Sequence, residues 1–222
     1  MKALKLDQEQ PGSLDDNTLV RRVLAGEKQL FELILRRYNQ TMYRVIRSYL
    51  GDSDDVKDVM QNAYLKAFDK LSQFRGDASF STWLIRIGIN EALGRLNAVN
   101  KGKTIYLDLS PEAKNNLMQV PDKQINPEAT LIRQESRQLL EKAIDKLPER
   151  YRVVYVLKEI EGLRSDEIEV ALGVSDANVK VRLHRARKLL KESLYALSQS
   201  RDVFEFGNAS CDAIVAFVMS RI

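Results

Sequence analysis

The segment from Ser165 to Lys191 contains two helix-forming stretches separated by Gly173, and the second stretch sorts its residues by chemistry. At about 100° per residue, its apolar residues fall within a stripe about 60° wide: Val179, Leu183, Ala186 and Leu190. The rest of its surface carries basic residues with no acidic residue among them: Lys180, Arg182, Arg185, Arg187, Lys188 and Lys191. The pattern predicts a helix-turn-helix whose second helix packs through one side and presents positive charge to phosphate on the other.

Helical periodicity also dominates the rest of the chain. From Leu14 to about Val99 it predicts four or five packed helices, with stops near Gly26, Gly51 and Gly76. The stretch 100–127 holds three of the five prolines and no sustained apolar period, which favours extended chain, including the short apolar run 104–109. We therefore expect an all-α fold with two small helical domains. The expected divisions are a flexible N-terminus, a first domain, an extended linker, a second domain and a C-terminal extension: 1–13, 14–99, 100–127, 128–197 and 198–222.

Composition excludes several classes of function. One cysteine, Cys211, and one histidine, His184, leave little material for a metal site or a histidine-based triad, and no glycine-rich phosphate loop is present. We expect no catalytic residues, no cofactor and no metal. No apolar run approaches the roughly 18 residues of a membrane span, and the N-terminus lacks a signal-peptide pattern, so we expect a cytoplasmic chain without membrane insertion.

The C-terminal extension is unusually apolar. Its residues Ile214, Val215, Val218 and Ile222 recur at helical spacing, with Cys211 on about the same side. A short helix docked on the protein is the favoured interpretation. A surface for a partner or a redox-responsive thiol is the alternative.

A second group of polar and aromatic residues lies between Phe74 and Asn90. A break at Arg75-Gly76-Asp77 precedes a helix on which Trp83 and Asn90 share a side, with Arg86 beside them. Aromatic and amide groups near a loop suit the capture of an unstacked base. A lone tryptophan at helical spacing is more often part of a core, so the spacing alone leaves both interpretations open.

Acidic residues open the helix that precedes this loop. Asp55, Asp58 and Gln61 fall within an arc of about 120°, away from the apolar residues of the same helix. Carboxylates in a first turn stabilise the helix dipole, which is a sufficient reason for Asp55. Asp58 and Gln61 lie further along. Because an acidic surface repels phosphate, this face is more suited to a protein partner.

These segments, in this order and spacing, resemble the extracytoplasmic-function sigma factors, a two-domain group of the sigma-70 family. The resemblance covers about residues 14–197. It is most specific over Asp58–Asn90, which follows the family's Asp-x-x-Gln helix, FRG loop and Trp-Leu helix ending in Asn, and it extends over Leu147–Leu190. It implies a sigma2-like bundle, a sigma4-like helix-turn-helix domain and a linker that threads through RNA polymerase.

The resemblance also implies partners and roles. Core RNA polymerase would be bound by Asp55, Asp58 and Gln61. The −10 promoter element would be read and opened by the loop 72–82 and its surroundings, with Phe74, Arg75, Trp83, Arg86 and Asn90. The −35 element would be read by Asn178, Lys180, Val181, Arg182, His184, Arg185 and Lys188. Many relatives have serine or threonine at the position of Val181, so the contact there would be apolar. An inhibitory anti-sigma factor is a further implied partner.

Two other classes of function remain as alternatives. A stand-alone DNA-binding regulator would use the helix-turn-helix, but it would need neither the acidic patch around Asp58 nor the segment around Trp83. An enzyme with an appended helix-turn-helix would need a catalytic constellation that the composition does not offer.

Overall fold

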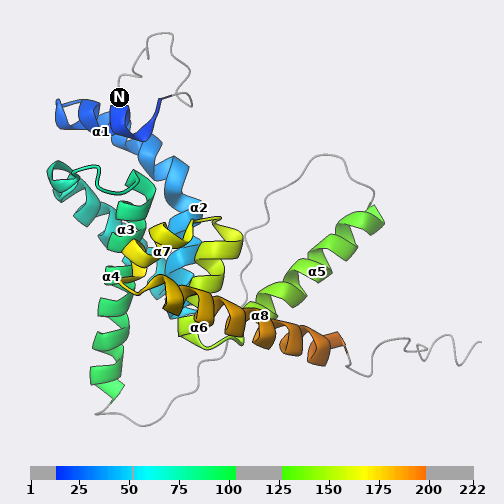
Figure 1. The fold of residues 1–222 in the computed structure, drawn as a ribbon. Coiled ribbons are helices and arrows are strands. Elements are labelled where there is room, and N and C mark those ends of the chain that lie inside the picture. Colours follow the sequence, from blue (N-terminus) through cyan, green and yellow to red (C-terminus); the bar gives the residue numbers. More distant parts are fainter. Residues whose placement is uncertain (1–13, 52, 104–126, 199–222) are drawn as a thin grey trace, which may run out of the picture.

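Helices account for all the regular structure in the part of the chain that the computed structural model describes, residues 14–51, 53–103 and 127–198 (Figure 1). This confirms the predicted all-α class for those residues. The expectations for residues 1–13, for the run 104–109 and for the C-terminal helix with Cys211 lie outside the described residues.

The N-terminal region is a helical bundle. Its α-helices are α1 (Asp16–Leu24), α2 (Phe31–Leu50), α3 (Asp55–Asp69) and α4 (Phe80–Lys103). Asp15 caps α1, since its carboxylate accepts a hydrogen bond from the Thr18 backbone N–H at 3.0 Å. The longer helices α2, α3 and α4 pack against one another through apolar faces. Among their fully buried residues are Ile34, Met42, Ile46, Ala63, Leu84 and Ile85.

The C-terminal region contains the predicted helix-turn-helix. Its helices are α5 (Pro127–Asp145), α6 (Glu149–Tyr155), a π-helical turn (Val156–Ile160), α7 (Ser165–Leu172) and α8 (Asp176–Ser198). Gly173 ends α7 with φ +65°, a left-handed conformation that glycine adopts without strain. Ser165 is the first helical residue of α7, and Arg164 holds the cap position. The Arg164 backbone N–H donates to the Glu167 carboxylate at 2.9 Å.

The two helical regions pack directly on each other. One apolar core contains α2 and α4 residues together with Leu157, Ile168, Ala171 and Val179 from the C-terminal region. In Figure 1, α6 and α7 lie against α2 and α4, and α8 extends away from them. A second, smaller core joins α5, α6 and α8. The sequence did not predict this contact between the regions.

Two glycines of α4 differ in their surroundings. A Cβ at Gly88 would lie 2.7 Å from Met42 Cε and 3.3 Å from Met42 Sδ, whereas a Cβ at Gly94 would meet nothing within 4 Å. Because alanine is the better helix former, Gly94→Ala is expected to raise the free energy of unfolding by about 0.5–1 kcal/mol. Gly88→Ala is expected to stabilise the protein less than Gly94→Ala does, because the added methyl must displace the end of the buried Met42 side chain.

Urea unfolding followed by circular dichroism checks both expectations. Gly94→Ala is the matched control, because it makes the same chemical change in the same helix. Equal stabilisation by the two substitutions would contradict the close approach of the Met42 side chain to Gly88.

Candidate nucleic-acid interface

Helix α8 has the two-sided character that the sequence predicted. The stripe Val179, Leu183, Ala186 and Leu190 is buried, with side chains no more than 9% exposed. Six of the seven candidate DNA-reading residues on α8 are exposed and Arg182 is half-buried: Asn178, Lys180, Val181, Arg182, His184, Arg185 and Lys188. The structure therefore brings these seven residues onto one helix that is anchored through its opposite side.

Two of the candidate DNA-reading residues on α8 have partners within the chain. Lys180 Nζ lies 2.6 Å from the Asp176 carboxylate one turn earlier, and this contact raises the pKa of Lys180. Arg185 donates to the Tyr151 hydroxyl on α6 at 3.1 Å, and the same hydrogen bond lowers the pKa of Tyr151. Tyr151 thus holds the Arg185 guanidinium in place on an otherwise exposed side chain. Val181 is 51% exposed, which leaves an apolar contact point between the charges.

An aromatic cluster lies where the loop before α4 meets the helix. Trp83 contacts the rings of Phe74 and Phe80 with centroid separations of 5.5 Å in both cases. Phe74 and Phe80 meet edge to face at 5.4 Å. Trp83 and Phe74 are half-buried, so each belongs partly to the core and partly to the surface. Half-burial of Trp83 fits a core residue and also leaves part of its ring open to a ligand, so the base-capture role stays a prediction.

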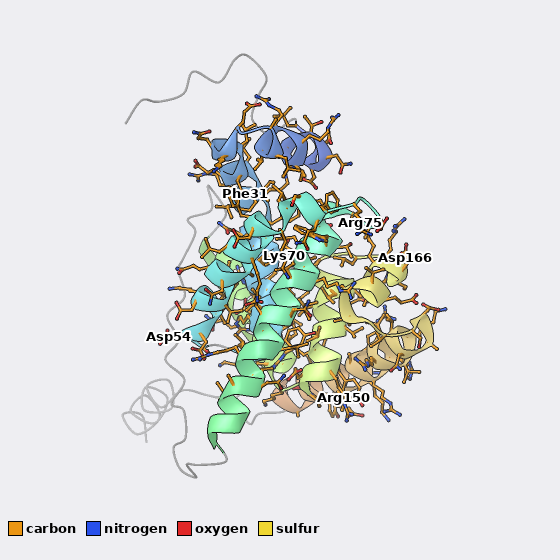
Figure 2. All side chains as sticks on the ribbon, turned by 90° about the vertical axis from the view of Figure 1, so that its left-hand side faces the viewer. Phe31, Asp54, Lys70, Arg75, Arg150 and Asp166 are labelled. Carbon is orange, nitrogen blue, oxygen red and sulfur yellow. The ribbon has the colours of Figure 1, made fainter. Side chains whose placement is uncertain are left out.

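Polar groups surround this cluster. Arg75, Arg86 and Asn90 are exposed, and Arg86 and Asn90 are one turn apart on α4. Ser79 caps α4 by accepting a hydrogen bond from the Thr82 backbone N–H at 3.2 Å. Figure 2 shows Arg75 on the loop before the start of α4, toward the same edge of the molecule as Asp166 of α7. A base that leaves its stack could meet an aromatic ring, a guanidinium and an amide within this area.

The acidic face of α3 divides into two parts. Asp55 makes an ion pair with Arg95 of α4 at 2.7 Å, and this pairing raises the pKa of Arg95. Asp58 and Gln61 are exposed. Leu65 lies on the same side of the helix, seven residues after Asp58, and is 65% exposed. Sequence reasoning missed Leu65, although its i+4 spacing from Gln61 was visible.

Neither a metal site nor a membrane span is found in the described ranges. No group of three or more His, Cys, Asp or Glu residues there could hold a metal ion. Over the same residues no helix combines the length and the apolar character that crossing a membrane needs.

Comparison with known proteins matches both helical regions. The family model for Sigma-70 region 2 matches residues 34–101, and that for Sigma-70, region 4 matches residues 137–190. The ECF RNA polymerase sigma-E factor of Escherichia coli K12 is 35% identical over 185 residues, which are 83% of this chain and 96% of that protein. The chain belongs to the extracytoplasmic-function group of the sigma-70 family.

Two solved structures share the fold of this sigma factor. CnrH, solved in complex with the cytosolic domain of CnrY, is 26% identical with a TM-score of 0.56, over 82% of this chain and 97% of CnrH. The sigma factor RpoE of Bartonella quintana, solved with the anti-sigma factor NepR, has a TM-score of 0.60 at 20% identity, over 74% of this chain and 96% of RpoE. The residues matched by the Sigma-70 region 2 model include α3 and the aromatic cluster. Those matched by the Sigma-70, region 4 model include α6, α7 and most of α8.

Three carboxylates of this sigma factor were also missed by sequence reasoning. Asp145, Glu161 and Glu167 belong to the C-terminal region, and each accepts hydrogen bonds from the N-terminal region. Their partners lie between 85 and 120 residues away in the sequence. No local pattern marks such pairs, since each carboxylate also suits an exposed helix end.

Proposed function

We propose that this chain directs core RNA polymerase to specific promoters and starts transcription there. The observation that carries the proposal is the pairing, in a member of the sigma-70 family, of the basic face of α8 with the aromatic cluster before α4. The basic face of α8 can hold duplex DNA, and the aromatic cluster can hold a base from an opened strand. The chain itself contributes recognition, and the polymerase contributes catalysis.

Each reading surface has its own role in this proposal. The exposed part of α8 reads the −35 element, with Arg185 available to guanine edges and the lysines to phosphates, and with the half-buried Arg182 at its margin. The loop 72–82 with Trp83, Arg86 and Asn90 opens and reads the −10 element. The region 14–99 reads the −10 element and the region 128–197 reads the −35 element. The residues between the end of α4 at Lys103 and the start of α5 at Pro127 connect them.

The partner surfaces follow from charge and exposure. Asp58, Gln61 and Leu65 form a small face of α3 with a carboxylate, an amide and an exposed leucine. Such a face fits a protein partner, because its charge opposes DNA, and we assign it to core polymerase. An anti-sigma factor is a second partner, supported by the fold shared with RpoE of Bartonella quintana, which was solved in complex with the anti-sigma factor NepR. The chain would act in the cytoplasm, where it meets polymerase.

Run-off transcription tests the proposal directly. Purified chain is added to core polymerase on fragmented genomic DNA, and transcript 5′ ends are mapped. We expect discrete start sites that share upstream elements and that require both components. Transcription that does not depend on the chain, together with tight binding of the chain alone to single sites, would favour a stand-alone regulator.

A further inference from the structure

The contact between the two helical regions joins carboxylates of one region to cations and hydroxyls of the other. The Asp145 carboxylate receives two parallel hydrogen bonds from the Arg47 guanidinium, both at 2.8 Å. Beside them, Arg152 Nε donates to the Ser48 carbonyl oxygen at 2.6 Å. Bidentate pairing of this kind is both strong and directional. It fixes the end of α5 and the start of α6 against α2.

Glu161 makes the second contact. Its carboxylate accepts from the Thr41 hydroxyl at 2.7 Å and from Arg44 Nη1 at 3.0 Å. The Glu161 side chain is only 6% exposed, so this charge has been removed from water. A buried charge is tolerated when it is paired and hydrogen-bonded, and both conditions depend on α2.

Glu167 makes the third contact, at the DNA-reading loop itself. Its Oε1 atom accepts from the Ser79 hydroxyl at 3.2 Å, close to the fully buried Thr82. Ser79 and Thr82 form the beginning of α4, at the end of the loop 72–82. Helix α7 therefore presses its acidic first turn against the segment assigned to the −10 element. Ile168 of α7 is fully buried in the shared core beneath this contact.

The packed arrangement of the two helical regions places the two DNA-reading surfaces too close together for the spacing of the promoter elements. The −35 and −10 elements are about 25 base pairs apart by position, which is about 85 Å of duplex at 3.4 Å per base pair. Duplex DNA resists sharp bending, because its persistence length is about 50 nm. Helix α7 packs on both α4 and α8, so the −10 loop and the start of α8 lie within about two helix diameters, roughly 25 Å. The two surfaces cannot reach both elements at once while these contacts exist.

We propose that this packing is a closed, self-inhibited form of the chain, latched by Asp145, Glu161 and Glu167. The inference rests on the proposed function, since it concerns access to the two promoter elements. Promoter recognition requires the latch to break and the regions to separate. The 23 residues from 104 to 126 can span about 80 Å when extended, so the regions can separate while the chain stays connected. Polymerase binding would supply the free energy that opens the chain.

The test removes the three latch charges and keeps side-chain shape. The variant carries Asp145→Asn, Glu161→Gln and Glu167→Gln. The control carries Glu27→Gln, Glu32→Gln and Glu141→Gln, whose partners Arg22, Arg36 and Arg137 lie in the same helical region as each glutamate. Both variants lose three negative charges, so any general gain in attraction to DNA is equal in the two.

Two measurements are made on the free chain, without polymerase. Small-angle scattering gives the radius of gyration, and fluorescence anisotropy gives affinity for a promoter fragment identified by run-off transcription and opened at −10. We expect the latch variant to expand and to bind at least about tenfold more tightly than the control, because apparent affinity scales with the fraction of open chain. Unchanged dimensions and affinity relative to the control would overturn the proposal.

A charge exchange guards against an unfolded variant. Asp145→Arg places two guanidinium groups opposite each other and should open the chain, whereas adding Arg47→Asp restores an ion pair and should close it again. Circular dichroism would show whether the single variant has lost its fold. If the double variant does not return to the wild-type radius of gyration, the proposal of a latch is overturned. If the wild-type chain gives no polymerase-dependent transcript, the proposed function fails. If the wild-type chain supports polymerase-dependent transcription but the latch variant keeps the radius of gyration and the DNA affinity of the control, only the proposed closed form fails.

Discussion

Replacing Asp58, Gln61 and Leu65 by alanine is expected to weaken binding to core RNA polymerase by about 100-fold or more. The three side chains lie within about 60° of one another on α3 and are all exposed. Truncating a leucine anchor and the polar groups around it removes both desolvated contact area and hydrogen bonds at one place. None of the three supports the core, so the fold should be unaffected. Affinity is measured by titrating labelled core enzyme with the purified chain.

A matched control is available in the same helical region. Leu24 is 51% exposed, and Gln29 and Asp69 are also exposed, so their replacement by alanine removes the same three residue types elsewhere. The control should bind polymerase as the wild type does. Equal weakening in both variants would mean that the effect arises from stability, and unaltered binding in the α3 variant would remove this face from the polymerase contact.

Much of the fold could be predicted because it follows from local periodicity. The buried stripe of α8 and the glycine turn at Gly173 depend only on residues within one or two turns, and both are present. The packing of the two regions could not be predicted in this way. Thr41 and Glu161 are 120 residues apart, and nothing near either residue indicates the other. Only the assembled surfaces determine that contact.

The candidate site shows the same division. The positions of Asp58, Gln61, Asn90 and the basic residues of α8 on exposed helix faces follow from helical geometry. The neighbours that these side chains contact on other helices do not follow from helical geometry. Arg185 is held by Tyr151 from another helix, and Trp83 shares its cluster with Phe80. Sequence spacing places a side chain on a face, but it does not say which neighbours restrict that side chain.

Replacing Arg185 and Lys188 by alanine is expected to reduce transcription from a duplex promoter by about 10- to 100-fold. Arg185 lies on the exposed face of α8 with its guanidinium fixed by Tyr151, which favours a specific contact with a base edge. Lys188 is close enough along the helix to hold an adjacent phosphate. A template already open at −10 depends less on upstream anchoring, so its transcription should fall by about threefold or less. Run-off assays on the two templates measure the ratio.

Tyr151→Phe separates recognition from positioning in this test. It keeps both charges of α8 and removes only the hydroxyl that accepts from Arg185 at 3.1 Å. If positioning matters, this variant should lose an intermediate amount of duplex transcription and should relax base preference upstream in a promoter library. Equal losses on duplex and open templates for the Arg185→Ala, Lys188→Ala chain would contradict a role in −35 recognition. They would indicate that these side chains act through the stability of α8, because a destabilised domain fails on both templates alike.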